Sequence, residues 1–552
     1  MLGAVATPSQ EALKTQGRFS VFATRIRPEA PSLADCAVAL VSAALLIISF
    51  PDFNLWPLAW IALVPLLLVV ARRPRPWRCF YLGWLFGTFF FYGSCYWLTY
   101  SMIHTGGISP WVAFPLLVPG AVLVGLFPAV FFLLLARVIR KRGTATLFFA
   151  PLFWPTLEWA RLEITGQLWN SIGYSQAYHP VLIRSAHWGG VYAVGFLIVL
   201  ANAAFAFALL RQNLRAYVIA AVALLVVAAT LFASSLPPSS VIRPNFEVPS
   251  ATVIAIQPNV PMTIVKSEAE MQQLTARHFE MTEAALRQLP DDGKPRLVIW
   301  PESPMNFSYG TDNLLRDRLE TFAKANRTSV LLNSQELAPN DGIYNSALLI
   351  NEEGKLVAQY DKIRLLPFGE YVPLPQWLPG AGLIRAIVGD FTPGTKYQLM
   401  PVGRVRAGVF ICIESAYPAI ARRFSSEGAD VLINISNDGY LGPTAVMRQH
   451  LGNAVFRAVE NGRPVLRVTN TGITAFITPY GEVRDATAGF QPEVRIWTIA
   501  QSAPAQTFYT KHGDLFAIAC AVLSLLIFVF SFSREATGQR RQSTNHFPTL
   551  EA

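Results

Sequence analysis

Charged residues are scarce in this chain of 552 residues. Only 14% of them are Asp, Glu, Lys or Arg, and 52% are hydrophobic, whereas soluble domains usually carry about 25% charged residues. The mean hydropathy is +0.36. This composition excludes an ordinary soluble enzyme and indicates a chain that is inserted in a membrane.

Cysteine is also rare, and its distribution excludes two kinds of site. Four of the five cysteines lie in or beside long apolar runs, and only Cys412 lies in the polar part of the chain. A disulfide within that polar part is excluded, because Cys412 has no partner there. The sequence also lacks cysteine and histidine pairs at the spacing of a metal site. We therefore expect neither a metal nor another cofactor.

Acidic residues are outnumbered by basic ones, 35 against 45, which gives a net charge of +10. The basic residues cluster at the ends of apolar runs. Such clusters are typical of topology signals in membrane proteins and not of a nucleic-acid-binding surface. We therefore expect the lipid bilayer as a partner and no nucleic acid.

Eight apolar segments predict membrane-spanning helices. Most approach the roughly 20 residues that a helix needs to cross the hydrocarbon layer, although the first, second and fifth are short. No cleavage site of small residues follows the first segment, so we interpret it as a retained helix and not as a signal peptide. The eight segments are 34–50, 54–71, 79–100, 111–136, 144–160, 189–210, 216–235 and 514–532.

The connections between these segments alternate in charge. Basic residues crowd the N-terminal arm, three alternate connections and the C-terminal tail, whereas the intervening connections carry few. The positive-inside rule places the basic connections in the cytoplasm. The alternation predicts eight spans with both termini in the cytoplasm, and it places the large polar segment on the other side of the membrane.

These signals divide the chain into five parts. We predict a cytoplasmic arm at 1–33, a membrane domain of seven helices at 34–236, a polar domain at 237–510, an eighth transmembrane helix at 511–533 and a cytoplasmic tail at 534–552. The polar domain is long enough to form a core of its own.

The polar domain alternates strands with helices. Runs rich in β-branched residues predict strands in ATVIAIQPN, PRLVIWPESP, TSVLLNSQE, VFICIES and ADVLINISND. Helix-like stretches cover Glu268 to Leu289 and Pro443 to Glu460, and NEEGK and TPYGE predict hairpin turns. This alternation indicates an α/β domain.

Three of the predicted strands end in reactive residue types. Glu302 follows VIW, Cys412 follows VFI, and Asn437 and Asp438 follow LINIS. In α/β sheets, functional residues gather beyond the carboxyl ends of the strands. Taken alone, a thiol at the end of an apolar strand is more often a buried structural residue than a nucleophile. Asn437 and Asp438 are typical of turns.

A cysteine nucleophile needs a base, because the thiolate attacks and a free thiol has a pKa of about 8.5. The polar domain contains His278, His450 and His512, and none of them follows a predicted strand. A carboxylate is the alternative, and Glu302 in WPESP is placed for it. The neighbouring tryptophan and prolines restrict the backbone and partly desolvate the carboxylate, which raises its basicity.

The oxyanion of an acyl-transfer intermediate also needs a cation or a hydrogen-bond donor beside it. The segment YDKIRLLPFGEYVP offers Lys362 and Arg364. The compact charge of a lysine can approach a single oxygen, so Lys362 suits this role. The alternative is an ordinary solvated lysine.

Together these motifs resemble a known family. The glutamate in WPES, the lysine in YDKIRLLPFGEYVP and the cysteine in ICIES resemble the Glu-Lys-Cys triad of the nitrilase superfamily. Spans on both sides of one such domain, PFGEYVP, WNSIGYSQ and SNDGYLG resemble the bacterial apolipoprotein N-acyltransferases. The resemblance covers about residues 34–532. It implies a polytopic α-helical membrane domain of about eight spans joined to an α/β nitrilase-like sandwich with α-β-β-α layers.

The resemblance also implies a reaction and a set of site residues. Cys412 would take an acyl chain from a phospholipid as a thioester and pass it to the N-terminal amine of a diacylglyceryl-cysteine lipoprotein. Glu302 would act as general base and then acid, and Lys362 would stabilise the oxyanion. Glu370 and Glu414 match further acidic positions of the family, where we expect Glu370 to orient Lys362 and Glu414 to hold the nucleophile's loop. Ordinary salt bridges are the alternative for these two.

The partners and the location follow from the same resemblance. It implies a phospholipid donor, a lipoprotein acceptor, a monomer, and a bacterial inner membrane with the catalytic domain in the periplasm. A membrane-anchored nitrilase-type amidase that hydrolyses small amides is the alternative, but one helix would suffice to anchor it. A transporter is disfavoured because the central spans contain few ionisable residues. We expect a mobile apolar loop at 373–387 beside the active site.

Two positions depart from the family pattern. Ile413 stands where the family often has an aromatic residue, and the segment after Val260 lacks a tryptophan that the family often has. We expect these departures to affect lipid contacts or acyl preference and not the triad.

Several polar and aromatic residues invite structural interpretations. Trp169 and Tyr174 fit an aromatic belt at the membrane interface, with a lipid entrance as the alternative. Glu158 and Arg161 are expected to pair with each other near the outer interface. Internal ion pairing is expected among the charged residues of FRAVENGRPVLRV, namely Arg457, Glu460, Arg463 and Arg467.

Overall fold

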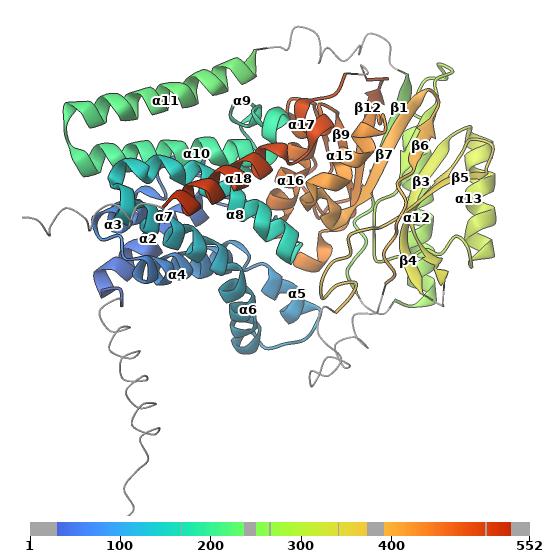
Figure 1. Ribbon diagram of the computed structural model, residues 1–552. Coiled ribbons are helices and arrows are strands. Elements are labelled where there is room, and N and C mark those ends of the chain that lie inside the picture. The colour runs from blue at the N-terminus through green and yellow to red at the C-terminus, as the bar shows by residue number, and fades with distance from the viewer. Residues whose placement is uncertain are drawn as a thin grey trace, which may run out of the picture.

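The computed structural model describes residues 30–166, 168–236, 250–263, 266–339, 342–372, 391–502 and 505–531. It consists of a group of helices and a part with two β-sheets (Figure 1). In Figure 1 the helices of the N-terminal half lie at the left and the sheets at the right. The C-terminal helix α18 (Leu515–Phe530), drawn in red, returns to the helical group.

The helical group is built from the first half of the chain. Its elements are α2 (Leu33–Ser49), η2 (Trp56–Trp60), α3 (Val64–Arg72), α4 (Pro76–Ser94), α5 (Leu98–His104), α6 (Pro110–Val124), α7 (Leu126–Arg142), η3 (Thr144–Phe149), α8 (Ala150–Thr165), η4 (Ile172–Gln176), α9 (Pro180–Ile183), α10 (Ala186–Arg211) and α11 (Leu214–Ser235). Each of the eight apolar segments contains helix.

Fewer of these helices qualify as membrane spans than the sequence predicts. Among the described residues, three helical stretches are long and apolar enough to cross a bilayer: Pro110–Arg142, Ala186–Arg211 and Leu214–Ser235. The shorter apolar helices are Leu33–Ser49, Trp56–Arg72 and Leu515–Phe530. Eight spans are therefore not confirmed, because several segments form helices shorter than a full crossing.

Small residues allow the helices to approach one another closely. A Cβ atom added at Gly83 of α4 would lie 2.7 Å from the carbonyl oxygen of Pro128 on α7. Gly190 in α10 has a φ of +64°, and an added Cβ there would lie 2.7 Å from the ring of Tyr509. Close packing of this kind stabilises helix association in membranes. Lipid tails are as apolar as the helix surfaces, so the hydrophobic effect does not favour contact between helices there.

Helix α18 packs on the helical group although it follows the sheets in sequence. The hydroxyl of Ser524 lies 3.2 Å from that of Thr156 on α8. Arg142, at the end of α7, donates to the carbonyl oxygen of Phe530 at 2.7 Å. The sheet part is therefore joined to the helical group at both of its ends.

The polar part of the chain forms two six-stranded sheets within the described residues. The first has the order β12-β1-β2-β3-β4-β5 and the second the order β11-β10-β9-β8-β7-β6. The strands are β1 (Ala251–Gln257), β2 (Arg296–Ile299), β3 (Ser329–Leu337), β4 (Ile343–Ile350), β5 (Leu356–Asp361), β6 (Leu399–Val402), β7 (Val405–Ile411), β8 (Val431–Ser436), β9 (Val465–Thr469), β10 (Ala475–Ile477), β11 (Val483–Arg484) and β12 (Glu493–Ile499).

Each sheet has three adjacent parallel strands at its centre. These are β1, β2 and β3 in the first sheet, and β7, β8 and β9 in the second. Helices α12 (Glu268–Leu286) and α13 (Asn313–Asn326) connect the first three, and α15 (Pro418–Ser426) and α16 (Val446–Asn461) connect the second three. Parallel neighbours require such crossover helices.

Alternation along β1 shows how the layers are packed. Ile254 and Ile256 belong to the apolar cluster of α12 and α13, whereas Val253 and Ala255 belong to the cluster that contains the second sheet. Successive side chains of a strand point to opposite faces. The two sheets thus face each other between layers of helices, which gives the expected α-β-β-α sandwich.

Local predictions for the polar part agree well with the structure. All five predicted strands are present as β1, β2, β3, β7 and β8, and the two predicted helices are α12 and α16. The turns at NEEGK and TPYGE join β4 to β5 and β10 to β11. The loop predicted at 373–387 lies outside the described residues.

Candidate active site

Cys412 lies where β7 ends, in an unusual backbone conformation. Its φ is +51°, which is in the left-handed region that side chains other than glycine rarely adopt. It is the first residue of a short 3₁₀ helix, η6 (Cys412–Ala416). Such a conformation persists only where the surrounding structure holds it, and it is found preferentially at functional sites.

Glu414 holds the turn that follows β7. Its carboxylate accepts hydrogen bonds from the backbone N–H groups of Ile411, Ile363 and Arg364 and from the hydroxyl of Tyr360, at 2.8 to 3.0 Å. Its side chain is fully buried. Glu414 therefore connects the turn of Cys412 to the segment that carries Lys362.

Lys362 lies between two carboxylates. Its Nζ is 2.9 Å from Glu370 Oε1 and 3.6 Å from Glu302 Oε1. The lysine side chain is only 1% exposed. Burial lowers the pKa of Lys362, but the charges of Glu370 and Glu302 outweigh burial, so the pKa lies above its ordinary value. The lysine is therefore a fixed cation.

The thiol of Cys412 is affected by the same charges. Burial raises the pKa of Cys412, the negative charge of Glu302 raises it further, and Lys362 acts in the opposite direction. The net pKa lies well above the ordinary value. The resting group is thus a neutral thiol, and its attack on a carbonyl requires a base at the moment of reaction.

Asn345 is a site residue that the sequence analysis missed. It lies on β4, and its Nδ2 donates to Glu302 Oε1 at 3.0 Å and to Glu370 Oε1 at 2.7 Å. Its Oδ1 accepts from Asn333 at 2.7 Å. Asn345 therefore fixes both carboxylates that flank Lys362. The polar pair Asn345 and Ser346 inside the otherwise apolar and aromatic run IYNSALLI was the signal that could have found it.

His450, which the sequence analysis set aside as a base, contacts the backbone of Cys412. It lies on α16, and its Nε2 is 3.0 Å from the carbonyl oxygen of Cys412. Its Nδ1 is 2.8 Å from Oδ1 of Asp438, which in turn forms an ion pair with Arg467 at 2.8 Å. Asp438 is thus more than the predicted turn former, whereas Asn437 does accept from the N–H of Gly439, as a turn residue would.

The expected ion pairs in α16 and β9 are partly present. Arg457 pairs with Glu460 at 2.8 Å within α16, as predicted. Arg467 pairs with Asp438 instead of with this group, and Arg463 donates to backbone carbonyls, including that of Ala429. Strand β9 directs Arg467 toward the carboxyl end of β8, away from α16's ion pair.

Within the described ranges, no group of three or more His, Cys, Asp or Glu side chains could hold a metal ion. The groups that the structure brings together at the site are a thiol, carboxylates, a lysine and amide groups.

Comparisons with known proteins identify the family of this chain. Residues 42–204 match the family model of the apolipoprotein N-acyltransferase N-terminal domain, and residues 252–507 match that of the carbon-nitrogen hydrolases. The apolipoprotein N-acyltransferase of Geobacter metallireducens is 33% identical over 91% of this chain and 96% of its own length. The chain belongs to the apolipoprotein N-acyltransferase family.

Other members of this family are similar over most of their length. The apolipoprotein N-acyltransferase of Rhizobium etli is 30% identical over 81% of this chain and 86% of its own, and that of Pseudomonas putida is 30% identical over 88% and 95%. Among solved structures, Nit3 of Saccharomyces cerevisiae, a nitrilase-superfamily member, covers 53% of this chain and 96% of its own at 18% identity, with a TM-score of 0.36.

The helical group and the sheet part of this chain meet through the segment WNSIGYSQ. Trp169 and Tyr174 in this segment are 8% and 5% exposed. The indole N–H of Trp169 donates to Gln449 on α16 at 2.9 Å, and the hydroxyl of Tyr174 accepts from Arg457 at 3.2 Å. The expectation of an aromatic belt at the membrane interface is therefore wrong, because these rings contact the catalytic domain.

Glu158 and Arg161 also form hydrogen bonds to this segment. Glu158 accepts from the hydroxyl of Ser171 and from the backbone N–H of Ile172, both at 2.8 Å, and Arg161 donates to the carbonyl oxygen of Trp169 at 2.9 Å. Both side chains thus form hydrogen bonds to the segment WNSIGYSQ. The predicted pairing of Glu158 with Arg161 did not include this segment.

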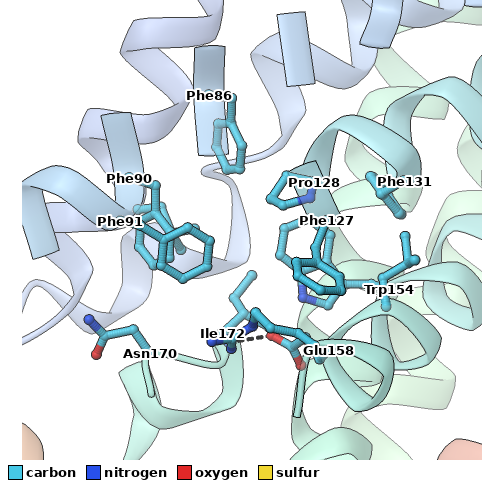
Figure 2. A pocket seen from close by; sticks show the side chains of 13 residues that line it. Phe86, Phe90, Phe91, Phe127, Pro128, Phe131, Trp154, Glu158, Asn170 and Ile172 are labelled. Atoms are coloured by element: carbon cyan, nitrogen blue, oxygen red, sulfur yellow. Dashed lines mark hydrogen bonds between the residues drawn. The ribbon is translucent and has the colours of Figure 1, made fainter. Parts of the chain in front are cut away.

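Both residues line a mostly apolar pocket (Figure 2). The empty space in it is about 420 Å³, part of which is open to the surroundings, and it lies among α2, α4, α7 and α8. Figure 2 shows the rings of Phe90, Phe91 and Phe127 around it, with Glu158 bonded to Ile172 at one end. Glu302, Lys362 and Cys412 are not among its lining residues, so this cavity is distinct from the active site.

Of the two positions that depart from the family pattern, Ile413 is buried, whereas the segment after Val260 is half-buried at Met262 and exposed on both sides of it. Ile413 is 8% exposed and belongs to the main apolar cluster. In the segment without a tryptophan, Met262 accepts a hydrogen bond from Asn437 at 3.3 Å through its sulfur. Their effect on acyl preference stays a prediction.

Proposed function

We propose that this enzyme moves an acyl chain from a membrane phospholipid to the N-terminal amine of a diacylglyceryl-cysteine lipoprotein, through a thioester on Cys412. The observation that carries the proposal is a buried lysine between two carboxylates beside a strained cysteine. Membership in the apolipoprotein N-acyltransferase family supports the lipoprotein acceptor.

In the first step, Glu302 acts as the base. Its carboxylate takes the proton of the Cys412 thiol as the sulfur attacks the carbonyl carbon of the phospholipid ester. Negative charge then develops on the ester oxygen, and the ammonium group of Lys362 stabilises it. When the intermediate collapses, Glu302 returns the proton to the departing alkoxide. The products are a lysophospholipid and an acyl-Cys412 thioester.

In the second step, the amine of the lipoprotein attacks the thioester. Glu302, again a carboxylate, takes the proton that the amine loses. The oxyanion forms once more beside Lys362, and its collapse releases the Cys412 sulfur as a thiolate, which recovers a proton from Glu302. The acyl chain ends as an amide on the lipoprotein, and the enzyme regains its starting state.

The remaining site residues orient these three groups. Glu370 accepts from Lys362 and from the backbone N–H of Leu366 at 2.8 Å, which supports a role in aiming the ammonium group. Asn345 would keep Glu302 at its place when the carboxylate changes its protonation state. Glu414 would hold the turn of Cys412 through its backbone contacts.

For the membrane, we propose the arrangement with a helical domain at 34–236, a catalytic domain at 237–510 and a last helix at 511–533. The alternating basic connections support eight crossings of the inner membrane, both termini in the cytoplasm, and a periplasmic catalytic domain. We further propose a monomer, since the helical group covers α16, an outer helix of the second sheet.

Labelled phospholipid tests this function. Incubation of the full chain with a phospholipid whose acyl chain is labelled should give an adduct on the peptide that contains Cys412, and hydroxylamine should remove it because it is a thioester. The C412A variant should give no adduct. A labelled protein in C412A, or no adduct in the wild type with intact membranes present, contradicts the mechanism.

A further inference from the structure

Helix α16 carries two consecutive polar residues whose contacts lead to different parts of the molecule. Gln449 and His450 are 6% and 3% exposed. Gln449 contacts the helical group, whereas His450 contacts Cys412. Neither residue takes part in the mechanism above.

The side-chain amide of Gln449 is fully used by the helical group. Its Oε1 accepts from the indole N–H groups of Trp97 and Trp169 at 3.1 and 2.9 Å. Its Nε2 donates to the carbonyl oxygens of Pro51 and Ser94 at 3.2 and 3.1 Å. Two acceptor sites and two donors are the whole capacity of this amide, and all four bonds go to residues outside the catalytic domain.

Both ring nitrogens of His450 also have hydrogen-bonding partners, and these partners lie in the candidate active site. Nε2 faces the carbonyl oxygen of Cys412, and Nδ1 faces Asp438. Asp438 cannot move toward or away from the ring freely, because Arg467 holds both of its oxygens at 3.0 and 2.8 Å. Asp438 therefore holds the imidazole ring through Nδ1, and the ring in turn holds the carbonyl of Cys412 through Nε2.

The carbonyl of Cys412 needs such a partner. Its backbone has a φ of +51°, a conformation that is unfavourable for a cysteine by itself. Two side chains of the described residues contact this carbonyl, His450 at 3.0 Å and the amide of Asn434 at the longer distance of 3.4 Å. The contact of His450 is thus the shorter of the two that stabilise the conformation of the nucleophile.

One ring links the two residues. The indole of Trp169, which donates to Gln449, also packs on His450 with 5.5 Å between ring centroids. We propose that His450 is a positioning residue for Cys412, and that Gln449 makes this positioning depend on the helical group. The inference relies on the proposed function in one respect, that Cys412 is the nucleophile.

The protonation of His450 decides which of its contacts are hydrogen bonds. Both nitrogens face acceptors, so both contacts are hydrogen bonds when both nitrogens carry protons, whereas a neutral ring donates through one nitrogen only. A glutamine side chain has an amide N–H that can replace Nε2–H, whereas leucine has no donor. These two substitutions therefore separate the hydrogen bond from the filling of space.

The first experiment measures the reactivity of Cys412 in H450Q and H450L. The full chain is treated with iodoacetamide, and the alkylated Cys412 peptide is followed by mass spectrometry beside the rate of acylation by phospholipid. We expect H450L to lower both rates by about 10- to 100-fold, as for the loss of one strong hydrogen bond, and H450Q to recover most of the loss. Equal rates in H450L and wild type, or no recovery in a folded H450Q, overturn the role of His450.

The second experiment tests the dependence on the helical group. In Q449M, residue 449 keeps its length and loses all four hydrogen bonds. In W97F, Gln449 is retained and loses one of its two indole donors. The matched control is Y178F, because the hydroxyl of Tyr178 donates to the backbone of Arg448 on the same helix at 2.6 Å. We expect Q449M to lower the alkylation rate about tenfold, W97F less, and Y178F less than twofold.

The outcomes of these experiments are distinct. If Q449M and W97F alkylate like the wild type, or if Y178F slows alkylation as much as Q449M, the coupling through Gln449 is wrong. Thermal unfolding of each variant identifies one that fails to fold, and W97F then decides in place of Q449M. If C412A still forms the acyl adduct, the proposed function itself fails; if only the His450 variants behave like wild type, the inference fails alone.

Discussion

At the scale of single residues, the site combines a permanent cation with a thiol that is neutral at rest. Glu370 and Glu302 keep Lys362 charged even though it is buried. Burial and the same Glu302 keep Cys412 protonated. In the proposed mechanism, this arrangement avoids a reactive thiolate in the absence of substrate and supplies positive charge where the oxyanion would form.

Lys362 gives the first prediction. K362A should lower the rate of Cys412 acylation on the order of 10²- to 10³-fold, because one oxyanion partner is lost. The rate of adduct formation with labelled phospholipid measures it. Lys355 provides a control, since it is exposed in the turn between β4 and β5. K355A should leave the rate unchanged, and an unchanged rate in K362A would remove Lys362 from the mechanism.

Glu302 gives a prediction with a defined sign. Its charge raises the pKa of Cys412, so E302Q should lower that pKa and shift the inflection of Cys412 alkylation toward lower pH. The same variant should lose acyl transfer, because the base is gone. The pH profile of iodoacetamide alkylation measures the shift. An inflection that stays in place or moves to higher pH would contradict the charge interaction.

The reactive residues at the strand ends were predictable from the sequence. Two residues that contact them, Asn345 and His450, were not. Glu302 and Cys412 each follow an apolar run in sequence, so a local pattern locates them. Asn345 and His450 lie 43 and 38 residues from the groups that they contact. No local pattern carries that information, because the pairing of strands and the placement of α16 bring them together.

At the scale of elements, close packing of α4 on α7 depends on the absence of a side chain at Gly83. The carbonyl oxygen of Pro128 and the ring of Phe132 lie within 2.8 Å of the Cβ that any other residue would carry. Helices in lipid associate through such contacts. The stability of the helical group is therefore sensitive to the addition of a single methyl group at Gly83.

This packing predicts different effects for two similar substitutions. G83A should lower the midpoint of thermal unfolding in detergent, because backbone atoms must shift by several tenths of an ångström. The matched control is G120A on α6, where nothing lies within 4 Å of the added atom. G120A should leave the midpoint unchanged or raise it, since alanine favours helix. Equal midpoints for the two variants would contradict the packing.

The sequence predicted the elements of the sheets better than the environment of the helical aromatic residues. Alternating apolar residues specify strands locally, and β1, β2, β3, β7 and β8 all formed. An aromatic residue in a loop beside a span has the same pattern whether it faces lipid or another domain. Trp169 and Tyr174 face α16, and only the tertiary structure distinguishes the two cases.

At the scale of the whole molecule, the sheet part and the helical group share buried polar contacts. Glu460 on α16 accepts from the backbone N–H of Val191 on α10 at 3.0 Å, and Arg457 bonds to Tyr174. Buried polar groups are costly when they lose their partners. The two parts are therefore expected to remain together during turnover, with substrates coming to a fixed site.

The central claim is that Cys412 carries the acyl chain from lipid to lipoprotein. A chase experiment tests it most directly: the acyl enzyme is formed with labelled phospholipid, freed from excess lipid, and mixed with a diacylglyceryl-cysteine peptide. The account predicts that the label leaves Cys412 and appears as an amide on the peptide's amine. Label that stays on the enzyme, or that is released to water as free fatty acid at the same rate with and without the peptide, would contradict it.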